Sequence, residues 1–120
     1  MSLKDSEWHL RAFKVLDCIE PVLPGTSITL TFSETRVKGS AGCNFYDSDA
    51  TYDEGNNGAI NVLGVGITEI LCTEPPGILS QEDRFVEFLQ AAKTFSRTDT
   101  MLILTDETSN EERVLIFDVS

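Results

Sequence analysis

The chain has 120 residues, of which 41% are hydrophobic and 24% charged, so it suits one globular domain and is too apolar to be disordered. Its 20 acidic and 9 basic side chains give a net charge of −11, which disfavours nucleic acid and anionic membrane surfaces as partners. No apolar run approaches the roughly 20 residues that span a bilayer, so no transmembrane segment is expected.

The first predicted element is a strand that begins near Trp8 and continues through residues 13–15. Residues 1–3 are interpreted as a cloning remnant, so a single domain is expected over residues 4–120. The start has no secretory signal, because charged residues begin at Lys4 and no hydrophobic region follows. A natural leader could have been removed upstream, so this start says little about the cellular compartment.

Sequence periodicity of two dominates the next part of the chain. Residues 28–33 alternate strictly between apolar and polar, which predicts a half-buried strand. Residues 36–43 continue the alternation with small residues on one face, as at the corner of a barrel. Residues 44–52 predict a long strand, and a turn signal at residues 55–58 precedes short strand segments over residues 60–67.

One later segment has helical periodicity, which predicts a single helix of about 13 residues with one apolar face. Its apolar residues, spaced i, i+3, i+4 and i+7, are Phe85, Phe88, Leu89 and Ala92. Ser80 is expected to cap the helix, since Asp83 completes a capping-box-like pair and Pro75-Pro76-Gly77 blocks an earlier start. Residues 101–105 and 114–119 then predict a closing hairpin.

Acidic residues gather in two further places. Residues 98–120 contain six acids and the single base Arg113, a pattern interpreted as solvated turns, with an acidic docking surface for a basic partner as the alternative. Residues 47–49, followed by Asp53, are similar to the start of a calcium loop. Because Tyr52 stands where an EF-hand needs glycine, this stretch is interpreted as a solvated acidic turn.

No established catalytic or metal-binding pattern occurs in the sequence. His9 is the one histidine, and the three cysteines (Cys18, Cys43 and Cys72) are scattered, which argues against both a zinc site and a Cys–His dyad. A nucleophile elbow and a phosphate-binding glycine loop are also missing. We therefore expect no catalytic residue, no metal and no cofactor.

Several short motifs follow one another in a defined order. They are Trp8-His9-Leu10, a strand ending in Gly39-x-x-Gly42-Cys43-Asn44 before an aromatic residue, Thr68-x-x-x-Cys72, a helix start Glu82-x-x-Phe85, and a closing hairpin over residues 102–117. In this order they resemble the META domain, or HslJ-like, family over nearly the whole chain. The resemblance implies a mainly β (α+β) fold, an antiparallel barrel-like sheet with one α-helix packed against it, which agrees with the periodicity.

The resemblance also implies a bacterial cell-envelope protein, exported or a lipoprotein, with a link to stress, motility or secretion. The family has no established catalytic residues, so none are carried over. The first function hypothesis is a non-enzymatic, monomeric envelope domain that either contacts an unidentified protein partner or serves as a stability module within a stress or secretion system. The alternative is a small-ligand binder using the barrel mouth or the groove between sheet and helix, although the 7 phenylalanines favour a filled core. A cysteine-dependent enzyme is a weaker third option.

Physical roles follow for some of the motif residues. Gly42 is expected to give backbone freedom where a strand bends, and Asn44 to bond local backbone or to adopt a left-handed conformation. Glu82 is expected to cap the helix, or to meet Arg84 or a buried donor.

The resemblance also suggests that Cys43 and Cys72 face each other. They would be either two small buried hydrophobic residues or a disulfide that closes a loop of about 30 residues. Cys18 has no place in the pattern.

Overall fold

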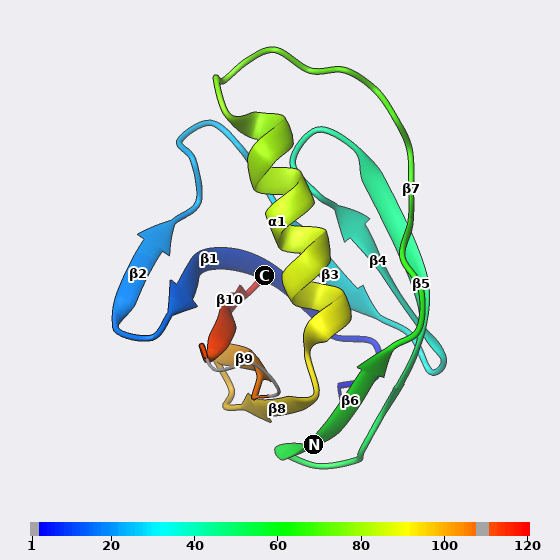
Figure 1. Cartoon of the computed structure of the whole chain (residues 1–120). Helices are drawn as coiled ribbons and strands as arrows, with labels where there is room; N and C mark the ends of the chain where they lie inside the picture. Colours follow the sequence, from blue (N-terminus) through cyan, green and yellow to red (C-terminus); the bar gives the residue numbers. More distant parts are fainter. Residues whose placement is uncertain (1–2, 108–110) are drawn as a thin grey trace.

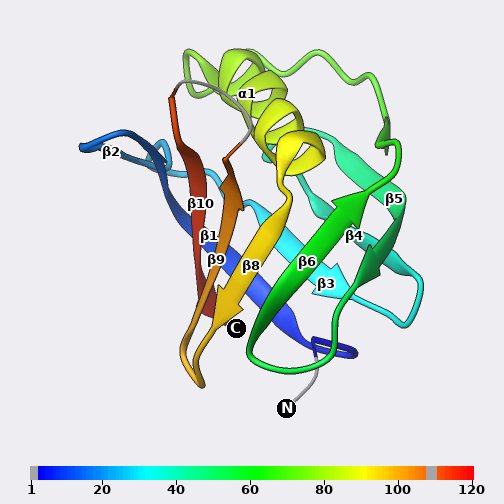
Figure 2. The same cartoon turned by 60° about the horizontal axis from the view of Figure 1, so that its bottom comes forward.

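The structure, a computed structural model, describes residues 3–107 and 111–120, and these residues form ten β-strands and one helix. Most of the strands alternate between apolar and polar residues. The strands are β1 (Glu7–Val15), β2 (Cys18–Pro21), β3 (Thr29–Phe32), β4 (Arg36–Ser40), β5 (Phe45–Tyr52), β6 (Asn57–Val62), β7 (Gly66–Ile67), β8 (Thr94–Arg97), β9 (Met101–Asp106) and β10 (Arg113–Val119), and the helix α1 spans Ile78–Ala91. The helix lies across one end of the sheet, as Figure 1 and Figure 2 show from two directions.

Eight of the strands close into an antiparallel barrel, in the order β1, β10, β9, β8, β6, β5, β4, β3 and back to β1. The closure depends on β1, since one of its edges pairs with β10 from Trp8 opposite Val119 to Val15 opposite Arg113. Its other edge pairs first with β3 and then with β2. The predicted barrel-like sheet with one helix is therefore confirmed.

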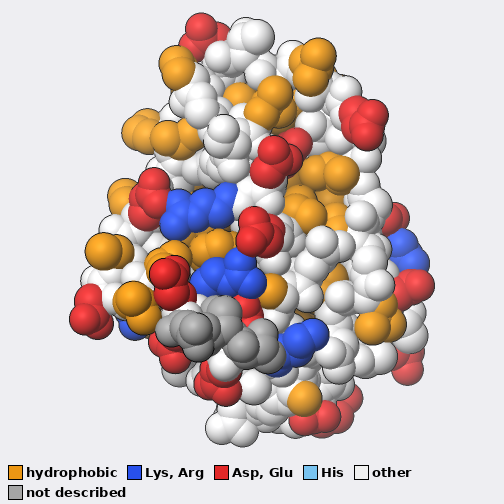
Figure 3. Space-filling view, in the orientation of Figure 1, with side chains coloured by type: hydrophobic (Ala, Val, Ile, Leu, Met, Phe, Trp, Pro, Cys, Tyr) orange, Lys and Arg blue, Asp and Glu red, His pale blue; other side chains and the backbone are white. Residues whose placement is uncertain are grey.

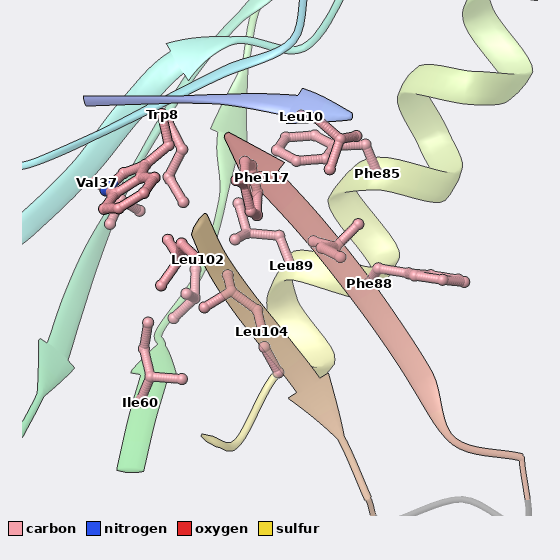
Figure 4. Packing of buried hydrophobic residues seen from close by; sticks show 14 of the residues in the cluster. Trp8, Leu10, Val37, Ile60, Phe85, Phe88, Leu89, Leu102, Leu104 and Phe117 are labelled. Carbon is pink, nitrogen blue, oxygen red and sulfur yellow. The ribbon is translucent and has the colours of Figure 1, made fainter. Parts of the chain in front are cut away.

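Inward-facing side chains fill this barrel. Leu30 and Phe32 of β3 point inward, as do Leu102 and Leu104 of β9, in the alternation that a half-buried strand requires. Figure 4 shows side chains of α1 packed against those of β1, β9 and β10. Six of the 7 phenylalanines lie in this core, and Phe45 is the exception, since it points outward with 67% of its surface exposed.

The N-terminal end of the described chain is part of the same packing. Leu3 is fully buried in the core, and its carbonyl accepts a hydrogen bond from the Ser6 amide. Trp8 is also fully buried and donates its indole N–H to the Ser6 hydroxyl at 2.8 Å. The packed domain therefore includes Leu3, one residue before the expected boundary at Lys4.

The helix begins three residues earlier than the sequence predicts. Gly77 is the N-cap, with φ 89°, so the expected role of Ser80 as the cap is wrong. The reason is that glycine adopts this positive φ without strain, which lets Ile78 start the helix and become buried. Within residues 3–107 and 111–120, no helix has the length and apolar character needed to cross a membrane.

The acidic stretch at residues 47–49 is part of β5, so its interpretation as a solvated turn is wrong. Asp47 and Asp49 lie on the outer face of the strand, where both form ion pairs with Arg36 of β4. Ser48 between them is buried. The alternation of a strand explains this pattern, which the clustered charges obscure in the sequence.

The predicted closing hairpin is confirmed as β9 and β10, and residues 108–110 of its loop lie outside the described residues. One acid of this region does not lie in a solvated turn. Asp106 is 1% exposed because it continues the inward-facing series of Leu102 and Leu104. Arg113 lies directly opposite and donates to its carboxylate from Nε at 3.0 Å and from Nη2 at 2.7 Å.

A close approach between β3 and β4 requires glycine at position 39. A Cβ atom added to Gly39 would lie 2.2 Å from the Thr29 carbonyl oxygen. That oxygen is held in place, because it accepts a hydrogen bond from the Tyr46 hydroxyl at 2.6 Å. The two strands would have to separate to admit a methyl group.

We expect Gly39→Ala to lower the free energy of unfolding by about 1–3 kcal/mol, because the added methyl group overpacks the contact between β3 and β4. Urea denaturation followed by circular dichroism measures the change. Gly66→Ala is the matched control, since its new Cβ would meet no atom nearer than 3.6 Å. Equal effects of the two substitutions would contradict the steric argument.

Candidate functional site

A groove of about 550 Å³ runs between α1 and the extended segment that follows β7. Its walls are formed by Ile67, Thr68, Glu69, Ile70 and Leu71 on one side and by Leu79, Glu82, Asp83 and Val86 of α1 on the other, with Asn44 between them. Figure 3 shows apolar side chains gathered along this groove, between the helix and the segment to its right. We define this hollow as the α1 groove.

Asn44 forms the polar centre of the α1 groove. Its backbone amide donates to Glu82 Oε2 at 2.7 Å, and its side-chain Nδ2 donates to Glu82 Oε1 at 2.7 Å. Both residues are buried, with Asn44 2% and Glu82 4% exposed. Each oxygen of the carboxylate therefore has a donor, as a buried charge requires.

The same asparagine also holds the segment beyond β7. Its Oδ1 accepts from the Ile70 amide at 2.6 Å and from the Thr68 hydroxyl at 2.8 Å, and its Nδ2 donates to the Ile70 carbonyl at 3.1 Å. The side-chain amide thus bonds to Ile70 as a peptide group of a neighbouring strand would. Asn44 is not among the residues with positive φ, so its predicted local or left-handed role is replaced by a long-range one.

The structure joins Cys43 and Cys72 in a disulfide with a Cα–Cα distance of 6.0 Å and a sequence separation of 29. Cys18 is free and exposed on β2. Because Cys43 precedes Asn44, residues 70 and 72 are attached to one corner of the barrel by a polar and a covalent link. The extended segment is therefore held at both positions.

Most of the residues of the family pattern meet at the α1 groove. Gly42 has φ 111°, and a Cβ there would face Gln81 and Ile78 of α1 at 3.8 Å, so the turn into β5 lies under the start of the helix. Glu82 does not cap the helix: of its three expected roles, the structure shows contact with a buried donor. Arg84 pairs instead with Glu20 of β2.

The remaining pattern residues support the groove or lie apart from it. Phe85 is fully buried beneath it, with edge-to-face contacts to Tyr46 at 5.4 Å and to Phe117 at 6.5 Å between ring centroids. Gly39 allows the close approach of β3 and β4 described above. Trp8 lies elsewhere, under the guanidinium of Arg97, so it belongs to the packing of the barrel and not to the groove.

The side-chain polar groups of Asn44, Thr68 and Glu82 in the groove bond to one another. The Thr68 hydroxyl donates to Asn44 and accepts from the Phe45 amide at 3.1 Å. In the core, apart from the groove, burial raises the pKa of Tyr46, whose hydroxyl donates to the Thr29 carbonyl. Among the described residues, no group of three or more His, Cys, Asp or Glu side chains is placed to hold a metal ion. What the arrangement offers chemically is shape, apolar surface and carboxylates.

Sequence reasoning missed the apolar rim of the groove. Ile70 and Leu71 line it and are 57% and 83% exposed, although both are large hydrophobic residues. Phe45, which is 67% exposed, lines a separate hollow with Asp47 and Gly66. The available signal was Ile70-Leu71, two adjacent apolar residues in a stretch with neither helical nor strand periodicity.

A sequence model of the META domain family matches residues 1–119. The chain belongs to the META domain family. The resemblance inferred from the ordered motifs is therefore confirmed, and the groove described above is a feature of a META domain.

Solved structures share the fold of this META domain. An NMR structure of a protein from Burkholderia xenovorans is 26% identical, with a TM-score of 0.76, and the match covers 98% of this chain and 83% of that one. A second NMR structure (17% identity, TM-score 0.67, 97% and 90% covered) and the crystal structure of a DUF4847 family protein from Bacteroides vulgatus (16%, 0.62, 94% and 92%) show the fold alone. No curated protein matches the chain.

In this META domain we expect Glu82→Gln to lower the free energy of unfolding by roughly 2–3 kcal/mol, because its amide group would face a buried N–H donor of Asn44. Chemical denaturation measures the change. Asp83→Asn is the control, since Asp83 is the exposed neighbour on the same helix turn and should change the value by less than about 0.5 kcal/mol. Similar losses for both variants would contradict a specific role for Glu82.

We expect non-reducing mass spectrometry of the denatured META domain to show one thiol available for alkylation, Cys18. Replacing Cys43 and Cys72 together by serine should lower the free energy of unfolding by about 3–4 kcal/mol, because the unfolded chain gains the entropy of an open loop of about 30 residues. Cys18→Ser is the control and should leave the stability unchanged. Alkylation of all three thiols without reductant would contradict the disulfide.

Proposed function

We propose that this META domain is a non-enzymatic, protein-binding domain of a bacterial cell-envelope protein, and that its partner binds at the α1 groove. The observation that carries the proposal is the exposure of Ile70 and Leu71 in the wall of a groove whose buried side-chain polar groups bond to one another. Large apolar side chains gathered on one surface are a feature of protein interfaces, because their burial against a partner is favourable.

Binding is favoured over catalysis by the state of the buried carboxylate. Glu82 accepts hydrogen bonds at both oxygens from Asn44, so neither oxygen is directed at a bound molecule. The hydroxyl of Thr68 is held by Asn44 in the same way. A general base or nucleophile needs a free group within hydrogen-bond reach of its substrate, and these residues serve as internal supports.

An envelope location is supported by the disulfide. Cys43 and Cys72 are joined in the structure, and disulfides persist in the oxidising periplasm and outside the cell, whereas the cytosol reduces them. The family resemblance points the same way, to exported proteins linked to stress, motility or secretion. We infer a monomer that engages a different protein.

A small ligand is the second candidate occupant of the groove. The volume of about 550 Å³ falls within the range of roughly 300–1,000 Å³ that is typical of ligand pockets. The barrel interior is filled by core side chains, so a ligand would have to bind outside it, between α1 and the segment beyond β7. A protein partner is favoured because the apolar wall residues Ile70 and Leu71 remain 57% and 83% exposed, a larger open apolar surface than a small enclosed ligand needs.

Site-specific photo-crosslinking in the source organism tests the proposed function. A photoreactive residue at Leu71 should give a crosslinked product in the envelope fraction, whereas one at Ile19, an exposed apolar residue of β2, should not. With the purified partner, Leu71→Asp should weaken binding by roughly tenfold or more and Ile19→Asp should leave it unchanged. Equal crosslinking at both sites, or full-length protein confined to the cytosol, would contradict the proposal.

A further inference from the structure

The segment beyond β7 has one bonded edge and one open edge. The Thr68 amide donates to the Phe45 carbonyl at 3.0 Å, and Asn44 bonds both backbone groups of Ile70. In the part of the chain that the structure describes, no hydrogen bond occupies the amide or carbonyl of Glu69 or Leu71. Because backbone groups alternate in direction along an extended chain, these groups point away from β5.

The open edge faces the helix across the α1 groove. Val65 shows this direction. It alternates with the residues bonded to β5, as Glu69 and Leu71 do, and its amide donates to Gln90 Oε1 of α1 at 2.9 Å. Farther along, the helix side chains that line the groove include Val86 and Leu79, which are apolar. The space between is therefore bordered by unpaired peptide groups on one side and apolar side chains on the other.

The charges around the groove indicate the chemistry of an occupant. Among the described residues, the ionisable side chains that line it are Glu69, Glu82 and Asp83, and all three are acidic. Both oxygens of the buried Glu82 accept hydrogen bonds from Asn44, whereas Glu69 and Asp83 are exposed. A second copy of the same segment would bring Glu69 toward these acids, so a partner with positive side chains fits and self-association does not.

We propose that the domain binds an extended segment of its partner as an added β-strand along Ile67–Leu71, and that this segment combines apolar side chains with Lys or Arg. The proposal rests on the proposed function and names the ligand class of the same groove. A strand over these residues spans about 13 Å, so the edge suits a partner stretch of about five residues. Backbone bonds would give affinity, and the apolar helix face with its acidic rim would give specificity.

Amide chemical shifts of the isotope-labelled, oxidised chain test this inference. The probe is a ten-residue peptide that alternates Lys and Val, compared with the same peptide carrying Glu in place of Lys. The Lys peptide should shift the amides of Ile67, Glu69 and Leu71 and slow their hydrogen exchange. The Glu peptide should bind at least roughly tenfold more weakly. Shifts centred outside the groove would overturn the inference.

Peptide N-methylation separates strand addition from side-chain docking. Methyl groups on alternate peptide nitrogens block one edge of the peptide strand and leave the other edge free. Of two peptides, methylated at every Lys or at every Val, one should lose at least roughly tenfold in affinity and the other should bind like the parent. Equal binding by both would overturn strand addition.

Charge reversal on the protein supplies a matched control. Glu69→Lys should lower the affinity for the Lys peptide by roughly tenfold. Glu54→Lys, which makes the same charge change in the exposed β5–β6 turn, should change that affinity by less than about twofold. Equal loss in both variants would overturn specific binding. If the crosslinked partner requires Leu71 but no peptide shifts these amides, strand addition fails and the proposed function stands. If neither a crosslinked partner that requires Leu71 nor a peptide-induced shift is observed, strand addition and the proposed function both fail.

Discussion

The double contact between Asn44 and Glu82 determines how the parts of this domain fit together. It joins the start of β5 to the second turn of α1, and the same asparagine bonds the backbone of Ile70. A carboxylate buried to this degree is tolerated only when donors satisfy it, so helix and barrel corner must keep their relative position. The α1 groove exists because these groups hold the helix beside the segment without closing the space between them.

The barrel leaves the outer surface as the place for function. Closure of β1 onto β10 removes the long free edges that an open sheet would present, and core side chains fill the interior. Gly39 and Gly42 bring the strands and the helix close enough for this packing. The free backbone groups beside α1 are therefore notable: they lie where β5 exchanges its short partner β7 for an irregular segment, at the mouth covered by the helix.

Local patterns account for what could be predicted. Strict alternation at residues 28–33 and an apolar stripe through Phe85 give a strand and a helix, because burial on one face requires these spacings. β2 could not be predicted, since its four residues are all exposed and show no alternation. Gly77 caps the helix in place of Ser80, because a helix that starts at Ile78 buries that side chain. Only a local role could be predicted for Asn44, because its hydrogen-bond partners are 24 to 38 residues away along the chain.

The two links at residues 70 and 72 have a consequence for the thermodynamics of recognition. Fixing a backbone residue costs about 1–2 kcal/mol of conformational entropy, and an unpaired segment would normally lose that freedom when a partner arrives. Here the Cys43–Cys72 bond and the Asn44 amide fix the segment during folding. Its shape is preorganised, so a larger share of any contact energy appears as affinity. The redox state of one cysteine pair would then adjust how tightly this surface binds while leaving the groove's side chains unchanged.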